Sequence, residues 1–96
     1  KFKNKMSEEY LRTAYLKCEG AGGRFFDEKL LRFEDYERNF VAGFFSLKKL
    51  TDGNLLEIKV IEDAEDKSLI DLPYHDCHIF SGGKRHYVKS NQIIYK

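Results

Sequence analysis

Two apolar runs meet at the dipeptide Asp52-Gly53, and this junction limits what the chain can fold into more than any other feature of the sequence. Asp-Gly between two such runs is among the strongest local signals of a β-hairpin, because a type I′ turn needs positive φ at both central positions. A two-residue loop places Leu50 opposite Leu55 and Lys48 opposite Glu57. The two runs are therefore predicted to form a hairpin with an ion pair across its strands.

This register divides the hairpin, residues 44–61, into an apolar face and a polar face. The apolar face contains Phe45, Leu47, Leu56, Ile58 and Val60, with Lys49 as its exception. The polar face contains Ser46, Lys48, Glu57 and Lys59. Because side chains alternate along a strand, a shift by one residue would turn the apolar set to water. The hairpin is therefore expected to form one wall of the core.

Two segments before the hairpin have helical spacing. The first begins at Ser7, a good N-cap residue, and its apolar residues repeat at three- and four-residue intervals as far as Cys18. The glycines within 20–23 are expected to end it. The second covers about Asp27 to Arg38 and contains pairs of opposite charge four residues apart. We expect a second helix there, with a strand as the open alternative, and Gly43 is expected to let the chain bend into the hairpin.

A second hairpin is predicted around Gly82-Gly83, between residues 77–80 and 84–88. It places His78 opposite Tyr87 and Cys77 opposite Val88. An acidic surface loop at 62–66, a short strand at 68–72 and a last strand at 92–95 complete the expected elements.

These elements predict an α+β fold, with one or two N-terminal helices packed on an antiparallel sheet of about four strands built from two β-hairpins. At 96 residues, 42 % of them hydrophobic, the chain is expected to form a single domain over 1–96, with 1–6 as a frayed terminus. No apolar run approaches the length of about eighteen residues that spans a membrane, so a small soluble domain is expected. Cys18 and Cys77 are compatible with free thiols or with one disulfide.

The densest group of reactive side chains is His75, Asp76, Cys77, His78 and His86. A nucleophilic cysteine needs a base within hydrogen-bond reach, but the predicted hairpin turns Cys77 and His78 to opposite faces. A structural zinc site needs a fourth ligand, and the spacing matches no standard zinc module. We therefore expect no catalytic residues, no metal site and no cofactor.

The polar face of the second hairpin is the predicted binding surface, formed by His78, Arg85, Tyr87 and Lys89. The net charge is only +1, yet the acidic segment 62–66 is separated from a basic, aromatic C-terminal part, and such segregation orients a partner. We expect a small non-catalytic binding module of the adaptor or inhibitor type, whose partner is another protein. The segment 62–66 is either a solvated turn or a docking patch for a basic partner.

Two alternatives in other functional classes remain open. The cations and tyrosines from residue 84 onward also suit phosphate contact and base stacking, which points to a nucleic-acid-binding domain or a small metal-independent ribonuclease. Separately, the run Asn39-Phe40-Val41-Ala42-Gly43 resembles the Gln-x-Val-x-Gly loop of cystatins, with Asn39 in place of the Gln. That resemblance implies a protease inhibitor that inserts this loop into a cysteine protease. No membrane partner is expected.

Overall fold

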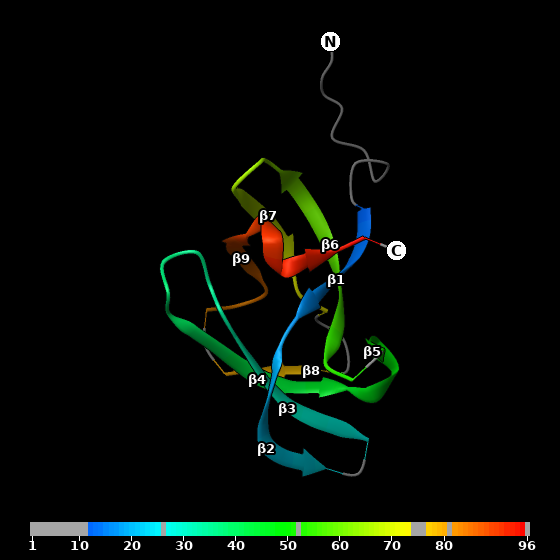
Figure 1. Ribbon diagram of the computed structural model, residues 1–96. Helices are drawn as coiled ribbons and strands as arrows, with labels where there is room; N and C mark the ends of the chain where they lie inside the picture. Colours follow the sequence, from blue (N-terminus) through cyan, green and yellow to red (C-terminus); the bar gives the residue numbers. More distant parts are fainter. Residues whose placement is uncertain (1–11, 26, 52, 74–76, 81, 96) are drawn as a thin grey trace.

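The computed structural model describes residues 12–25, 27–51, 53–73, 77–80 and 82–95. In these ranges the chain forms β-strands joined by turns and short 3-10 helices, without an α-helix (Figure 1). The predicted α+β fold is therefore wrong. The predicted frayed segment 1–6 lies outside the described residues.

The strands are β1 (Arg12–Lys17), β2 (Glu19–Phe25), β3 (Glu28–Glu34), β4 (Phe40–Ser46), β5 (Leu50–Thr51), β6 (Leu55–Asp63), β7 (Lys67–Asp71), β8 (Cys77–Ile79), β9 (Arg85–Lys89) and β10 (Ile93–Ile94). The 3-10 helices are η3 (Leu47–Lys49) and η4 (Ser90–Gln92). All pairs are antiparallel. One sheet has the order β10-β1-β6-β7-β9, with β5 also paired to β6, and the other has the order β2-β3-β4-β8. Two sheets thus replace the single predicted sheet.

The first predicted helix is a strand where the structure describes it. Ala14 and Leu16 of β1 are fully buried, whereas Thr13 and Lys17 are exposed, so burial follows the two-residue period of a strand. β1 pairs with β6 on one side and with β10 on the other. It continues through Cys18 into β2 and so carries the chain from one sheet to the other (Figure 1). The glycines expected to end a helix belong to β2.

The second predicted helix is also wrong, and its strand alternative is correct for residues 28–34. Leu31 and Phe33 of β3 are buried, while Arg32 and Glu34 are exposed. β3 is an interior strand that pairs with β2 and β4. The pairing with β4 covers the whole strand, whereas the pairing with β2 is interrupted by a register shift between Gly20 and Arg24. An isolated helix of this length would be only marginally stable, so the pairing partners decide in favour of the strand.

The central hairpin forms with a register shifted by one residue from the prediction. Leu50 pairs with Leu56 and Thr51 with Leu55, so the loop has one residue more than expected. The shift exchanges the lysine in the ion pair: Lys49, rather than Lys48, lies 3.8 Å from the carboxylate of Glu57.

The strand expected before this turn is interrupted by the helix η3. Its N-cap is Ser46, whose hydroxyl accepts a hydrogen bond from the backbone N–H of Lys48 at 3.2 Å. Ser46 is therefore buried, although the predicted register turned it to solvent. Phe45, Leu56, Ile58 and Val60 are buried as predicted, whereas Leu47 in η3 is only partly buried. Phe45 belongs to β4 in the other sheet and does not pair with Val60.

The second predicted hairpin is wrong in its pairing. β8 pairs with β4 in one sheet, while β9 pairs with β7 in the other. Gly43 lies inside β4, opposite Ile79, and is not a bend between elements. The short strand expected at 68–72 and the last strand expected at 92–95 are confirmed as β7 and β10, with bounds shifted by one or two residues.

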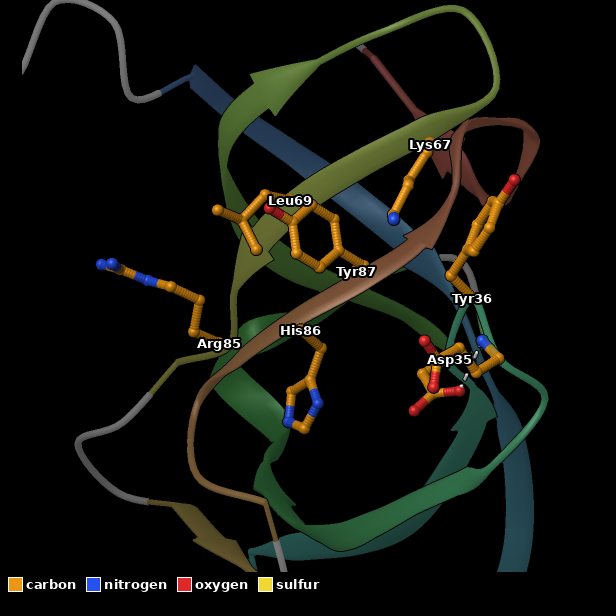
Figure 2. Close-up of a pocket in the computed structure, with 8 residues that line it drawn as sticks. Asp35, Tyr36, Lys67, Leu69, Arg85, His86 and Tyr87 are labelled. Carbon is orange, nitrogen blue, oxygen red and sulfur yellow. Dashed lines mark hydrogen bonds between the residues drawn. The ribbon is translucent and has the colours of Figure 1, made fainter.

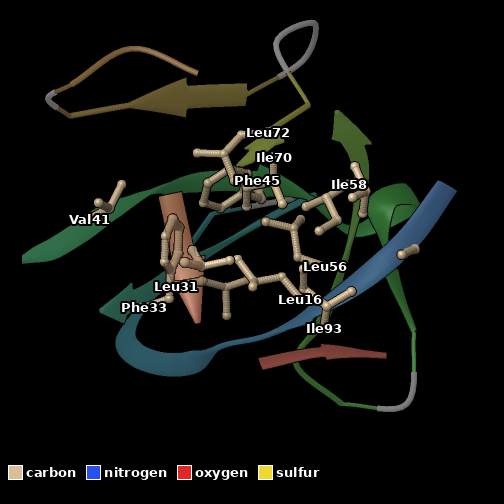
Figure 3. Close-up of a cluster of buried hydrophobic side chains, with 13 residues drawn as sticks. Leu16, Leu31, Phe33, Val41, Phe45, Leu56, Ile58, Ile70, Leu72 and Ile93 are labelled. Atoms are coloured by element: carbon tan, nitrogen blue, oxygen red, sulfur yellow. The ribbon is translucent and has the colours of Figure 1, made fainter. Parts of the chain in front are cut away.

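The core lies between the two sheets (Figure 3). Its buried members are Ala14, Leu16, Leu31, Phe33, Val41, Phe45, Leu56, Ile58, Val60, Ile70, Leu72, Val88 and Ile93. Cys18, Cys77 and Ile79 are partly buried against this cluster. Both cysteines are free thiols, and burial raises the pKa of Cys18 to about 12, which keeps its thiol protonated at neutral pH.

Candidate functional site

A tight turn between β3 and β4 supplies one side of the candidate site. The carboxylate of Asp35 accepts hydrogen bonds from the backbone N–H groups of Glu37, at 2.9 Å, and Asn39, at 2.8 Å. Arg38 adopts a positive φ of 71°, which lets the chain reverse. The backbone N–H of Tyr36 donates to the carbonyl of Tyr87 at 2.8 Å. The turn is thereby attached to β9 and places the ring of Tyr36 beside that strand.

The connection between β6 and β7 supplies a second side, and two serines hold it. Ser68 is completely buried, and its Oγ lies 3.1 Å from a carboxylate oxygen of Asp63 and 2.7 Å from Oγ of Ser90. Ser90 Oγ donates to the carbonyl of Ala64 at 2.7 Å, and Ser90 N–H donates to the carbonyl of Asp66 at 2.9 Å. The acidic segment 62–66 is thus tied to the start of η4.

A hydrogen bond from the hydroxyl of Tyr36 to the carboxylate of Asp66 joins these two sides, although the residues are 30 positions apart in the sequence. The bond and the charge of Asp66 raise the pKa of Tyr36, so the phenol remains a neutral donor at physiological pH. Two acidic segments, 34–37 and 62–66, are consequently held next to each other. Glu37, Glu62 and Glu65 are exposed and form no ion pair with any described residue.

Lys67, the first residue of β7, extends between two tyrosine rings. Its Nζ lies 4.5 Å from the ring centroid of Tyr87 and 4.9 Å from that of Tyr36. Figure 2 shows the ammonium group between the two rings, in front of β9. Both distances are within the range of cation–π attraction. Among the described carboxylates none forms an ion pair with Lys67, so the two rings are its principal partners.

These side chains line an open pocket of about 540 Å³. Its lining residues are Asp35, Tyr36, Glu37, Lys67, Leu69, Arg85, His86 and Tyr87. Tyr87 is 43 % exposed, which is high for so large an aromatic residue. A pocket with exposed aromatic rings and polar groups around them is typical of a recognition surface.

The two cations of the pocket differ in how they are neutralised. Arg85 forms two hydrogen bonds to the carboxylate of Asp71, at 2.9 Å and 3.3 Å, and this partner raises its pKa. Lys67, in contrast, forms no ion pair with a described carboxylate, and its ammonium lies over the two tyrosine rings. Asp35 and Glu37 line the same pocket, and Asp66 accepts the hydrogen bond from Tyr36. Without the ammonium of Lys67 the site would therefore carry an excess of negative charge.

His86 lies on the other side of β9 from Lys67 (Figure 2). Its Nε2 is 2.8 Å from the carbonyl oxygen of Gly83, and its ring meets the ring of Phe33 edge-on at 5.9 Å. These contacts attach the start of β9 to the core. A structural role accounts for His86 within this arrangement.

The structure brings together only two of the four predicted binding residues. Arg85 and Tyr87 both line the pocket. Lys89 lines a different cavity of about 410 Å³, together with Arg32 and Phe40. His78 lies on β8 in the second sheet, so it does not share a strand pair with Tyr87 as the second hairpin required.

His78 belongs instead to an aromatic cluster on the second sheet. Its ring centroid is 5.5 Å from that of Phe80, which in turn is 5.7 Å from that of Phe44. Phe80 is 50 % exposed. The cluster is separate from the pocket at β9 and forms a second aromatic surface.

Several other features of the sequence also have a defined place. The run that resembles the cystatin loop is not a loop: Phe40–Gly43 belong to β4, and Val41 is buried. Cys77 and His78 are neighbours on β8, while His75 and Asp76 lie outside the described residues. Within the described part of the chain, no three His, Cys, Asp or Glu side chains are grouped so that they could hold a metal ion.

No described helix is long and apolar enough to cross a membrane.

Tyr36 and Lys67 are central to the site but were not predicted from the sequence. Tyr36 stands in the acidic run Glu34-Asp35-Tyr36-Glu37, and Lys67 directly follows the acidic segment 62–66. A tyrosine within an acidic run indicates a possible binding residue only if that run is assigned to an exposed turn. Because a helix was predicted at 27–38, Tyr36 was not recognised as such a residue.

Comparison with known proteins finds no matching family model, no matching curated protein and no matching solved structure. The geometry of the site therefore carries the functional argument.

Proposed function

We propose that this chain is a non-catalytic binding module that recognises a basic segment of another protein at the pocket beside β9. One observation carries the proposal: Tyr36 and Tyr87 present their rings to a single cationic group in an open pocket with an acidic rim. Tyrosine is enriched among the residues that dominate binding energy at protein interfaces.

The arrangement of charge supports a basic partner. The hydrogen bond between Tyr36 and Asp66 holds the segments 34–37 and 62–66 together, and several of their carboxylates have no cationic partner among the described residues. Such a concentration of negative charge attracts and orients a positively charged segment. Nucleic acid fits this surface less well, because the carboxylates would repel its phosphates.

The hydrogen bonds that hold the pocket in place also support a binding function. Backbone hydrogen bonds attach Tyr36 to Tyr87 and Ser90 to Asp66, and a buried serine holds the acidic connection. A surface that is already ordered loses little conformational entropy on binding. The pocket is therefore expected to bind a peptide without a large cost for ordering its own side chains.

A direct test uses three fluorescent probes: a lysine-rich peptide, a glutamate-rich peptide of the same length, and a single-stranded RNA oligonucleotide. Fluorescence anisotropy should show binding of the lysine-rich peptide only. Tyr87→Ala should weaken this binding about tenfold or more, because loss of a central aromatic residue removes at least about 1.4 kcal/mol. Phe80→Ala is the control, since Phe80 is an aromatic residue that is 50 % exposed, belongs to the second aromatic cluster and lies outside the pocket.

Circular dichroism should show that each variant remains folded. Equal losses in Tyr87→Ala and Phe80→Ala would contradict the proposed surface. Tighter binding of the RNA than of the lysine-rich peptide, with a steep log-linear dependence on salt, would replace the protein partner by nucleic acid.

A further inference from the structure

We infer that the space between Tyr36 and Tyr87 is a receptor for a trimethylammonium group, contributed by a trimethylated lysine of the partner, and that Lys67 occupies this receptor in the free protein. The inference rests on the proposed function and specifies the chemical group that enters the pocket. In this arrangement Lys67 acts as an internal ligand that the partner displaces.

The geometry of the rings is the first support. Both rings lie within 5 Å of one nitrogen atom, at 4.5 Å and 4.9 Å from their centroids, so both direct their negative faces toward the same point. The position of each ring is determined independently of Lys67: the backbone N–H of Tyr36 is bonded to β9, its hydroxyl is bonded to Asp66, and Tyr87 is part of β9. The receptor therefore persists when the lysine leaves.

The charge around the rings is the second support. Asp35 and Glu37 line the pocket, and Asp66 stands behind the hydroxyl of Tyr36. The other cation of the pocket, Arg85, is already neutralised by Asp71 at 2.9 Å. When Lys67 withdraws, the vacated position is bounded by the two tyrosine rings, with Asp35 and Glu37 in the same pocket and Lys89 as the cross-strand neighbour of Lys67. The ring faces attract a cation at this position.

The hydration of the two competing cations decides which one is favoured. The ammonium of Lys67 is compact and strongly hydrated, and it is exposed enough to regain water when it leaves the rings. A trimethylammonium group cannot donate hydrogen bonds to water, and aromatic faces are the usual means of recognising such groups. When a trimethylammonium group replaces Lys67 between the rings, the released ammonium regains hydration, and the trimethylammonium group loses little hydration.

The experiment measures binding of tetramethylammonium chloride by NMR, against sodium chloride and ammonium chloride at the same ionic strength. In the native protein the ε-methylene protons of Lys67 should be shifted upfield by the two rings. Tetramethylammonium should move them toward the position of a solvated lysine, and the two other salts should not. This measurement needs no variant, so it does not depend on the folding of a mutant.

Variants then test the competition. Lys67→Ala should raise the affinity for tetramethylammonium about tenfold, because the binding-competent state no longer has to be opened. Lys89→Ala is the matched control: Lys89 pairs with Lys67 across the strands, so the variant removes the same charge without emptying the ring pair. In the background of Lys67→Ala, replacement of Tyr36 or Tyr87 by Leu should abolish the binding.

Two results would overturn the inference: ε-methylene protons of Lys67 that do not respond to tetramethylammonium, or an affinity that rises equally in Lys67→Ala and Lys89→Ala. A trimethyllysine peptide and phosphatidylcholine vesicles distinguish a protein from a lipid source, and only the peptide should bind. Binding of unmodified basic peptides without displacement of Lys67 would preserve the proposed function and reject the receptor. Displacement by tetramethylammonium without binding of any peptide would preserve the receptor and reject the proposed function.

Discussion

The carbonyl oxygen of His78 lies only 2.5 Å from the position that a Cβ atom on Gly43 would occupy. Real Cβ atoms do not approach a carbonyl so closely, and the oxygen belongs to the backbone, so it cannot move away without moving β8. Gly43→Ala is therefore expected to displace β8 from β4 and to lower the free energy of unfolding by about 1–3 kcal/mol. Urea denaturation measures this change.

Gly20→Ala is the control for this prediction. Gly20 is also in a strand, but its nearest contact would be the flexible side chain of Lys29 at 3.6 Å, which is an ordinary distance. We expect a change within about 0.5 kcal/mol. If Gly43→Ala is as well tolerated as Gly20→Ala, β8 does not pack against β4 as described.

The alternation of β6 gives a second prediction. Ile58 is 2 % exposed, whereas its neighbour Lys59 is exposed and donates a hydrogen bond to the hydroxyl of Thr13 at 2.7 Å. Ile58→Ala should lower the free energy of unfolding by about 2–5 kcal/mol, because it leaves a cavity between the sheets. Lys59→Ala should have an effect of about 0.5 kcal/mol or less. Similar losses from the two substitutions would reject the assigned faces of β6.

A third prediction concerns the ionisation of Tyr95. Burial, and then the hydrogen bond to Asp63 at 2.8 Å, raise the pKa of Tyr95 from 10.0 to about 12. Since the folded state holds the proton more tightly than the unfolded state, this contribution to stability is complete below pH 10 and is lost as the pH rises toward 12. Asp63→Asn removes the anionic acceptor and should lower the pKa of Tyr95.

NMR titration of the Tyr95 ring resonances, assigned with Tyr95→Phe, measures this pKa in both proteins. An unchanged pKa in Asp63→Asn would show that the hydrogen bond to Asp63 contributes nothing and that burial alone raises it.

At Gly82-Gly83 the sequence predicted the backbone conformation correctly but the strand partners wrongly. Gly82 and Gly83 have positive φ, as a turn at this dipeptide requires, yet β8 and β9 diverge into different sheets. Partners distant in sequence determined the outcome: Ile79 pairs with Gly43, and Val88 pairs with Ser68. Pairings of this kind leave no local trace in the sequence.

The two predicted helices failed for a different reason. The helix predicted over 27–38 relied on Leu30 and Phe33, which are three residues apart, whereas the strand buries Leu31 and Phe33, which are two apart. Because Leu30 and Leu31 are both apolar, so short a segment fits either period. The faces of β6 were predicted correctly because Leu56, Ile58 and Val60 alternate over a longer run. The type of secondary structure was thus predicted wrongly where the alternating apolar segment was short.

The candidate site was predicted in part for related reasons. Arg85 and Tyr87 stand at alternate positions of one strand, and this periodicity placed them on one face. Tyr36 reaches the same pocket from the turn between β3 and β4, and Lys67 reaches it from β7. The hydrogen bond between Tyr36 and Asp66, which are 30 positions apart, holds these two segments together. Only the tertiary structure could join these contributions.

The position of β1 has a consequence for synthesis in the cell. This strand pairs with β6 on one edge, but its other edge at Tyr15 and Leu16 is covered by Ile94 and Ile93, which are translated almost at the end of the described chain. During translation that edge has to remain unpaired while nearly every other strand emerges from the ribosome. Open strand edges invite association with other chains, and contacts so distant in sequence form slowly. The edge of β1 at Tyr15 and Leu16 is therefore expected to stay open to association until β10 has been made.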